Sequence, residues 1–305
     1  MEGFFAYAFA LCAVLLFASL SALVSERAGV VNIGIEGMMT IGALITAILG
    51  TYVNKNANGN YSQIWVVLVA AIFSGFFALL HALPAITLRS NQIVSSTALN
   101  ILAMGIAMFL ATSGWFGPNA TDIDSGYETI SFGRVFPMWL LIAILATIGI
   151  AIFFNFTRGG MRFTMTGENP NAVDAAGISV VKIRYWAVFF SGILAGLAGG
   201  VMITTVIGSG IFIGGTYGFG FLALAIMIFG QWRVPYLSLG VILFAFLFAL
   251  GNRIGFLIDP QSDFVNWAQI FKVLPFVLTL VVMVIFAKKS KAPAADGVPF
   301  DKARR

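Results

Sequence analysis

The sequence predicts an all-α, polytopic integral membrane protein, and three observations lead to that prediction. Of 305 residues, 60% are hydrophobic and only 10% are charged, whereas soluble proteins carry about 25% charged residues. Apolar runs close to the roughly 20 residues that a membrane helix needs recur along the chain. Glycine is abundant, with 33 residues, as in membrane helices that pack closely. Lipid is therefore the solvent that suits this composition.

About nine segments are long and apolar enough to be candidate spans, and the whole of 1–287 is expected to form one transmembrane domain. The candidates are 3–24, 29–52, 64–88, 93–116, 136–156, 184–207, 216–231, 235–256 and 268–287. The segments around 29–52 and 208–231 are rich in glycine and interrupted, which is typical of broken or re-entrant helices. The count of spans is therefore eight to ten.

Basic residues indicate how the chain is oriented, because short cytoplasmic loops carry an excess of Lys and Arg. The connection 157–185 and the tail 288–305 are basic, whereas the connection 118–134 carries three acids. Nine spans place the N-terminus outside and both basic segments inside. The Pro-, Ala- and charge-rich tail is expected to be disordered. These segments account for the net charge of +5, and we expect no nucleic-acid partner.

Polar residues interrupt the second candidate span between Ser25 and Met39. Asn32 and Glu36 stand there among three glycines, a composition that permits an unwound backbone inside the membrane. We expect these two side chains to line a translocation path or to hold its broken backbone. The alternative is that Glu26 and Arg27 form an ion pair at the membrane surface while Glu36 caps a helix start.

A polar stripe follows at the start of the candidate span 93–116. Gln92, Ser96 and Asn100 are four residues apart and so share one helical face. Such a face needs water or a protein partner inside a membrane. It is either a hydrogen-bonding wall for a polar solute or a set of hydrogen bonds between helices, and the sequence favours neither.

The basic connection 157–185 contains the pattern of a short helix. Asn169 suits its N-cap, Pro170 its first turn and Gly177 its end. A short helix on the cytoplasmic face is a natural docking surface for a partner. The alternative is an ordinary helix at the membrane interface.

Other features are expected to be structural. The glycines at 192, 196 and 200 are four apart and predict a close helix-packing face. His81, near Pro84, is interpreted as a hydrogen-bonded structural residue in preference to a proton relay, and Cys12 as a packing residue. No phosphate-binding Gly-x-x-x-x-Gly-Lys-Ser/Thr loop occurs. With one His and one Cys, the chain offers no metal cluster, and no catalytic constellation indicates an enzyme.

The three polar segments carry a resemblance to a known family. The runs 26–39, 92–100, 167–178 and 218–232 resemble signatures of the permease subunits of ABC importers for branched-chain amino acids, ribose and nucleosides. The similarity extends over about residues 20–285. The smaller permease of the basic-membrane-protein-dependent nucleoside importers is the most similar subgroup. One departure is Phe219, which stands where that subgroup is expected to have a polar or basic residue.

The resemblance implies a machine of several chains in a bacterial plasma membrane. A second, homologous permease completes the channel, a separate ABC subunit binds ATP and Mg²⁺, and an extracellular or periplasmic lipoprotein delivers a nucleoside. This chain itself is then neither an enzyme nor a holder of cofactors. The expected ATPase-coupling residues are Gly167, Glu168, Asn169, Pro170, Asp174, Ala176 and Gly177. The expected path residues are Asn32, Glu36, Gln92, Ser96, Asn100 and Phe219.

Two rival functions remain open from the sequence. The same machinery carries sugars or branched-chain amino acids in other members of the group. An ion-coupled secondary transporter needs a carboxylate deep in the membrane, and Glu36 is the candidate for it. A docking loop at 157–185 argues against that second rival.

Overall fold

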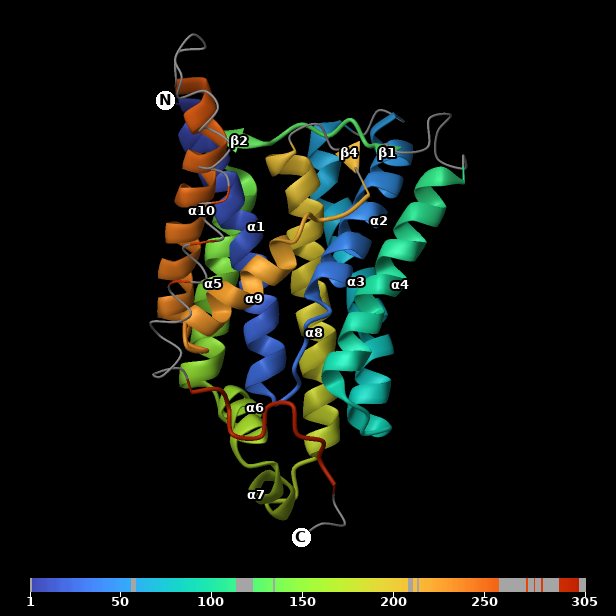
Figure 1. The fold of residues 1–305 in the computed structure, drawn as a ribbon, viewed down its shortest axis with the longest axis vertical. Helices are drawn as coiled ribbons and strands as arrows, with labels where there is room; N and C mark the ends of the chain where they lie inside the picture. Colours follow the sequence, from blue (N-terminus) through green and yellow to red (C-terminus); the bar gives the residue numbers. More distant parts are fainter. Residues whose placement is uncertain are drawn as a thin grey trace.

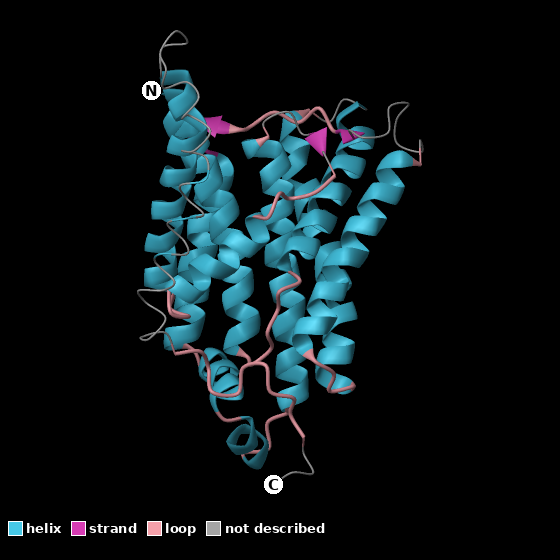
Figure 2. Ribbon diagram, in the orientation of Figure 1, coloured by secondary structure: helices cyan, strands magenta, loops and turns pink. Residues whose placement is uncertain are grey.

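The protein is described here from a computed structural model that covers residues 2–55, 59–113, 123–133, 135–207, 211–212, 214–257, 273, 277, 281 and 291–301. Helices make up most of these residues (Figure 2). The long helices are α1 (Glu2–Arg27), α2 (Ile35–Lys55), α3 (Gln63–Ala82), α4 (Gln92–Thr112), α5 (Met138–Phe156), α8 (Val180–Val201) and α10 (Val234–Leu257). Shorter helices are α6 (Arg158–Glu168), α7 (Pro170–Ala175) and α9 (Phe219–Phe229).

Irregular turns and very short strands complete the architecture. A 3-10 turn, η1 (Asn60–Ser62), precedes α3, and π-helical turns end α3 and α8 at η2 (Leu83–Thr87) and η3 (Met202–Val206). Two antiparallel pairs of two-residue strands cap one end of the bundle. They are β1 (Ile123–Asp124) with β4 (Ile211–Phe212) and β2 (Ser131–Phe132) with β3 (Phe136–Pro137).

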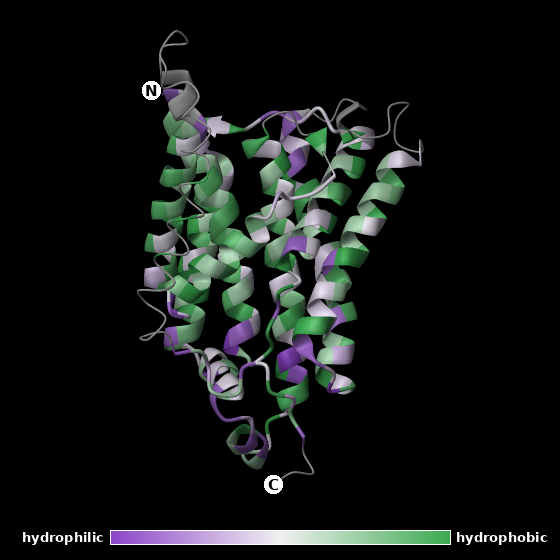
Figure 3. Cartoon of the chain, in the orientation of Figure 1, coloured by the Kyte–Doolittle hydropathy of each residue, from purple (hydrophilic) through white to green (hydrophobic). Residues whose placement is uncertain are grey.

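Seven helices of the described residues are long and apolar enough to cross a membrane, which confirms a polytopic membrane protein. Hydrophobic residues cover these spans, and hydrophilic residues gather at the end that carries α6 and α7 (Figure 3). The expected span 216–231 contains only the 11-residue helix α9, which is about 16 Å long and so crosses half of a bilayer. The expected ninth span, 268–287, falls almost entirely outside the described residues.

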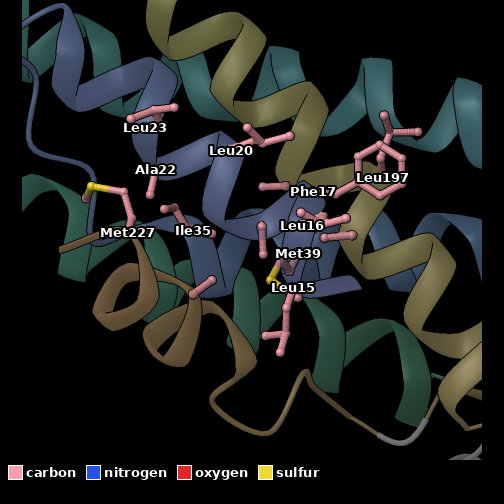
Figure 4. Close-up of a cluster of buried hydrophobic side chains, with 14 of the residues drawn as sticks. Leu15, Leu16, Phe17, Leu20, Ala22, Leu23, Ile35, Met39, Leu197 and Met227 are labelled. Atoms are coloured by element: carbon pink, nitrogen blue, oxygen red, sulfur yellow. The ribbon is translucent and has the colours of Figure 1, made fainter. Parts of the chain in front are cut away.

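The core forms around α1 and α8, which lie side by side in the middle of the bundle. Leu15, Phe17 and Leu20 of α1 meet Leu197 of α8 and Met39 of α2 in one apolar cluster (Figure 4). The predicted glycine face of α8 is confirmed, because a methyl group at Gly192, Gly196 or Gly200 would overlap atoms of α3. These close contacts fix α8 between α2 and α3, and so they position the segments that lead into α2.

Two passages of the polypeptide through the bundle begin with a non-helical segment and continue as a helix. Residues 28–34 run into the bundle without helical structure and lead into α2, and residues 214–218 lead into α9. Both helices begin inside the bundle, near each other (Figure 1). The sequence predicted interruptions in both regions, and the structure confirms them.

The end of the molecule that holds α6 and α7 also holds residues 291–301 (Figure 1). Helix α6 is an amphipathic element that the sequence analysis did not separate from the loop around it. Residues 291–301 were expected to be disordered, but they follow a defined path in contact with Gly167, Arg184 and Arg89. Residues 288–290 and 302–305 of that tail lie outside the described residues.

Candidate functional site

Glu36 joins the two broken spans at the point where their helices begin. Its carboxylate accepts hydrogen bonds from Thr216 Oγ1 (2.7 Å), Gly218 N (2.8 Å) and Gly220 N (2.7 Å). The side chain is 6% exposed. A carboxylate in the first turn of α2 therefore supplies acceptors for the free N–H groups at the start of α9.

This arrangement satisfies the electrostatic needs of a helix start inside a membrane. The first N–H groups of a helix have no partner within the helix and carry a partial positive charge, which a carboxylate stabilises. A Cβ atom at Gly220 would lie 2.6 Å from Glu36 N, so glycine is what permits the close approach. The interpretation of Glu36 as a helix cap is confirmed, although the capped helix lies 184 residues away.

Side chains of α4 hold the non-helical backbone of the first break. Gln92 Oε1 accepts from Val31 N at 2.8 Å. Asn100 Oδ1 accepts from Gly37 N at 2.8 Å, and its Nδ2 donates to Ile33 O at 3.0 Å. An unpaired backbone group is costly in a membrane, so these bonds stabilise a backbone that is otherwise unfavourable there.

Asn32 and His81 complete the same set of bonds. Asn32 Oδ1 accepts from Gly34 N (3.1 Å), and Asn32 Nδ2 donates to Ser191 Oγ (3.1 Å). His81 Nε2 is 3.2 Å from Val31 O, and its Nδ1 is 3.0 Å from Ser95 Oγ. His81 is thus the hydrogen-bonded structural histidine that the sequence predicted.

The polar stripe on α4 lies against the first break. Ser96 is buried and donates within its own helix to Gln92 O and Ile93 O, whereas Gln92 and Asn100 bond to the broken backbone. The structure therefore brings Asn32, Gln92 and Asn100 together around one segment. Phe219 lies apart from them, 7% exposed and packed 5.1 Å from the ring of Phe248.

Sequence reasoning missed the partners of Glu36. Thr216 and the backbone of Gly218 and Gly220 lie across the fold, and only the Gly-Phe-Gly run signals a close backbone approach there. The ion pair between Glu26 and Arg27, which was the alternative interpretation of this segment, does not form in the described part of the chain. Glu26 Oε2 accepts from Trp232 Nε1 at 2.7 Å, and the Arg27 guanidinium lies 4.6 Å from the centre of the Phe154 ring.

The expected coupling residues form a compact turn at the end of the molecule. Asn169 caps α7 by accepting from Ala172 N at 3.1 Å, with Pro170 in the first turn and Gly177 at φ +78° after the helix, as predicted. Glu168, Asn169, Ala176 and Gly177 are exposed. Val173 is buried, and it anchors this short helix to the bundle. Pro170 and Asp174 are half-buried, and Gly167 is buried against the backbone of Arg27 and Gly29.

No cluster of three His, Cys, Asp or Glu residues suitable for a metal ion occurs in the part of the chain that the structure describes. The arrangement instead has the features of a transport domain: two broken helices that meet inside a helical bundle, and a short capped helix displayed at one end. Comparison with known proteins decides between transport families. The model of the branched-chain amino acid transport system / permease component family matches residues 4–286.

The chain belongs to this family. It is the transmembrane permease subunit of an ABC importer, and it is not itself the enzyme of that machine. The match covers all seven long helices as well as α6, α7 and α9. The matched region therefore includes both broken spans.

Three relatives are similar to this permease over nearly their full lengths. The guanosine ABC transporter permease protein NupQ of Bacillus subtilis is 36% identical, over 96% of this chain and 94% of the relative. The nucleoside ABC transporter permease protein NupC of Lactococcus lactis is 32% identical, over 95% and 94%. The putative glucose ABC transporter permease protein TsgC13 of Haloferax volcanii is 33% identical, over 88% and 87%. No solved structure matches the chain.

Proposed function

We propose that this permease forms half of the translocation path of an ATP-driven importer for nucleosides in a bacterial plasma membrane. The observation that carries the substrate is the similarity, over almost the whole chain, to relatives named for guanosine and for nucleosides. A second, homologous permease completes the path. A separate ABC subunit binds ATP and Mg²⁺, and an extracellular or periplasmic lipoprotein delivers the nucleoside.

The proposed orientation places the end with α6, α7 and residues 291–301 in the cytoplasm and the N-terminus outside. Supporting it, Arg158, Arg162, Lys182 and Lys291 lie in these segments or directly after them, and basic residues favour the cytoplasmic side. The N-terminal end of α1 lies at the opposite end of the bundle (Figure 1). The α6–α7 end is then the one that an ATP-binding subunit reaches.

The coupling surface in this proposal is the exposed side of α7 and the turns that flank it. Glu168, Asn169, Ala176 and Gly177 are exposed there, and the buried Val173 fixes the helix to the bundle. A docked ATPase can therefore move α7 and the bundle together. Alternating access follows when that movement rocks the helices around the two breaks.

In this proposal the polar residues near the breaks act by holding the backbone that borders the path. Asn32, Gln92 and Asn100 use their side-chain amides on the backbone of the first break, and Glu36 uses its carboxylate on α9. Ser96 and Phe219 fill buried positions beside them. Solute specificity then resides in groups that become accessible when the breaks move.

A sugar is the second candidate solute, because one relative with 33% identity is named as a putative glucose permease. The ion-coupled carrier is disfavoured by the geometry of Glu36. A carboxylate that binds and releases a proton in each cycle would lose its charge at a helix start that it stabilises through three hydrogen bonds. Membership of a permease family that works with an ATPase also argues against an ion-coupled carrier.

The test is uptake of labelled guanosine and uridine by cells with and without this permease. Unlabelled glucose, ribose or leucine is added in excess in parallel assays, and a proton uncoupler is added under conditions that preserve ATP. The host strain lacks its other nucleoside transporters. The proposal expects uptake that depends on the permease, resists all three competitors and persists with the uncoupler.

Other outcomes identify which part of the proposal is wrong. Uptake that glucose or ribose abolishes would make the solute a sugar, and uptake that leucine abolishes would make it an amino acid. Uptake that collapses with the uncoupler while ATP is maintained would contradict the ATP-driven mechanism. Equal uptake with and without the permease, in the strain that lacks other carriers, would overturn the nucleoside assignment.

A further inference from the structure

Residues 291–301, which we call the strap, cross the end of the bundle between the coupling region and the first broken span. Ala295 N donates to Gly167 O at 2.8 Å, and Ala294 N donates to Glu168 Oε2 at 3.3 Å. At its far end, Asp301 forms an ion pair with Arg89 at 2.9 Å. The strap therefore touches the end of α6 and the turn between α3 and α4.

Arg184 joins the strap to the first broken span. This arginine of α8 is fully buried. Its Nε donates to Ala28 O at 3.2 Å, its Nη1 to Val298 O at 2.9 Å and its Nη2 to Ala295 O at 3.5 Å. One guanidinium thus bonds to the strap and to the residue that follows α1, with rigid geometry because the group is planar.

Asp296 of the strap partly offsets the charge of Arg184. A buried cation is costly unless an anion compensates for it, and Asp296 of the strap interacts electrostatically with Arg184. Burial raises the pKa of Asp296 to about 7. Asp296 Oδ1 is buried and has no hydrogen-bond partner among the described residues, and the interaction of this side chain with Arg184 is electrostatic.

The backbones of α6 and the first break are in direct contact beneath the strap. A Cβ atom at Gly167 would lie 3.0 Å from the carbonyl carbon of Arg27 and 3.1 Å from Gly29 N. On the other side, Val31 and Gly297 line the same cavity, together with Ser90 and Gln92. The end of α6, the strap and the start of the break therefore form one continuous set of contacts.

We propose that the strap and Arg184 are positioning elements of the transport cycle, which tie the end of α6 to the first broken span so that movement of the coupling region reaches Ala28. This inference rests on the proposed function, since it assumes that an ATPase moves α7. The strap bonds to Glu168, which lies 126 residues before Ala294, and to Arg184, which lies 111 residues before Ala295. When the strap is released, α6 can move while the first broken span stays in place.

The experiment measures whether the state of the ATPase reaches the break through the strap. In the full transporter, Cys12 is replaced by alanine and Val31→Cys reports on the break. A water-soluble maleimide labels this thiol with and without trapped ATP. Ser90→Cys, in the same cavity but on the α3–α4 turn, is the matched control position. Two chains are compared, one ending at residue 301 and one ending at residue 290.

With the strap present, trapped ATP is expected to change the labelling rate at Val31→Cys by about fivefold or more, the lower end of typical coupling between sites. Without the strap this change disappears, while the ATPase rate stays within about twofold. Arg184→Gln in the chain that ends at 301 gives the same loss. The proposal is overturned if the ATP-dependent change in labelling rate at Val31→Cys survives removal of the strap. It is also overturned if removal of the strap abolishes an equal ATP-dependent change in labelling rate at Ser90→Cys.

A second measurement separates a failed fold from a failed proposal and does not depend on the solute. Arg89→Cys and Asp301→Cys are joined by a short thiol cross-linker in the assembled transporter, with Arg89→Cys and Lys291→Cys as the control pair. The docked strap predicts efficient linkage of the first pair alone. Equal linkage of both pairs contradicts a docked strap. If wild-type transporter carries no nucleoside, the substrate proposal fails, and the labelling and cross-linking results still decide the role of the strap.

Discussion

The two broken spans are stabilised in different ways. Around residues 28–37, the non-helical backbone is held by side chains from α4 and α3 and by Asn32 within the break itself. At the start of α9, the carboxylate of Glu36 accepts from two backbone N–H groups and from Thr216. The first break is therefore held by many modest bonds, whereas the bonds of the second break in the described residues centre on the carboxylate of Glu36.

This difference predicts the largest effect for Glu36→Ala. The change leaves the buried N–H groups of Gly218 and Gly220 without their acceptor, at a cost of about 1–3 kcal/mol for each group. We expect the thermal unfolding midpoint in detergent to fall by about 6 °C or more, and uptake to be lost. Glu36→Gln keeps one acceptor oxygen and is expected to be intermediate.

The matched control for that experiment is Glu128→Ala, which removes an exposed glutamate outside the spans. Its unfolding midpoint is expected to stay within about 2 °C of the wild type, since exposed substitutions change stability by no more than about 0.5 kcal/mol. Equal midpoints for Glu36→Ala and Glu128→Ala would show that α9 does not depend on Glu36.

Asn100→Leu tests the distributed support of the first break. It removes the acceptor of Gly37 N and the donor to Ile33 O, while the bonds from Gln92, Asn32 and His81 remain. Each of these two backbone groups costs about 1–3 kcal/mol when it is left unpaired. The total is expected to be smaller than for Glu36→Ala, because hydrogen bonds to a neutral amide are weaker than those to a carboxylate. Uptake is expected to be reduced but measurable. Thr97→Val, on the exposed side of the same helix, is the control and should behave as wild type. A larger loss at Asn100 than at Glu36 would reverse the comparison.

The end of the first break that lies next to α6 is expected to respond to pH through Asp296. Burial in the docked strap raises the pKa of this carboxyl from 3.8 to about 7, so the docked strap retains a proton that the free strap releases. Docking is therefore strongest below about pH 4, weakens as pH rises to about 7, and changes little above that. A spin label at Val298→Cys should become more mobile over this window. Asp296→Asn should abolish the dependence, and mobility that falls as pH rises would contradict the sign.

The smallest effect is expected for Ser96→Ala. Among the described residues its hydroxyl bonds to carbonyl groups of its own helix, so stability should change by about 1 kcal/mol or less. Uptake and its KM for guanosine should match those of the wild type. A KM that rises severalfold without a change in stability would show that Ser96 touches the solute, and the stripe on α4 would then be a wall of the path.

Local sequence signals predicted much of the fold. Apolar runs placed the long helices, glycine-rich interruptions placed both breaks, and Asn169, Pro170 and Gly177 placed α7. Each of these signals depends on neighbours along the chain. The glycines of α8 likewise predicted close packing, because small residues at four-residue spacing let the backbones of membrane helices approach closely.

The partners across the fold could not be predicted in the same way. Glu36 meets Gly220 across 184 residues, and Arg184 meets Val298 across 114, and hydropathy carries no information on such pairings. Composition suggested a disordered tail for residues that bury Ala295 and partly offset the charge of Arg184. Phe219 illustrates the same limit, because its motif suggested a pore while its ring packs on Phe248.

The measurement that tests the account most directly is guanosine uptake into proteoliposomes that contain the complete transporter, with either ATP or an imposed proton gradient as the energy source. A permease whose Glu36 holds a helix start is predicted to import guanosine with ATP and no gradient, and to import none with a gradient and no ATP. Uptake driven by the proton gradient in the absence of ATP would contradict the account, and would make the Glu36 carboxylate a carrier of protons.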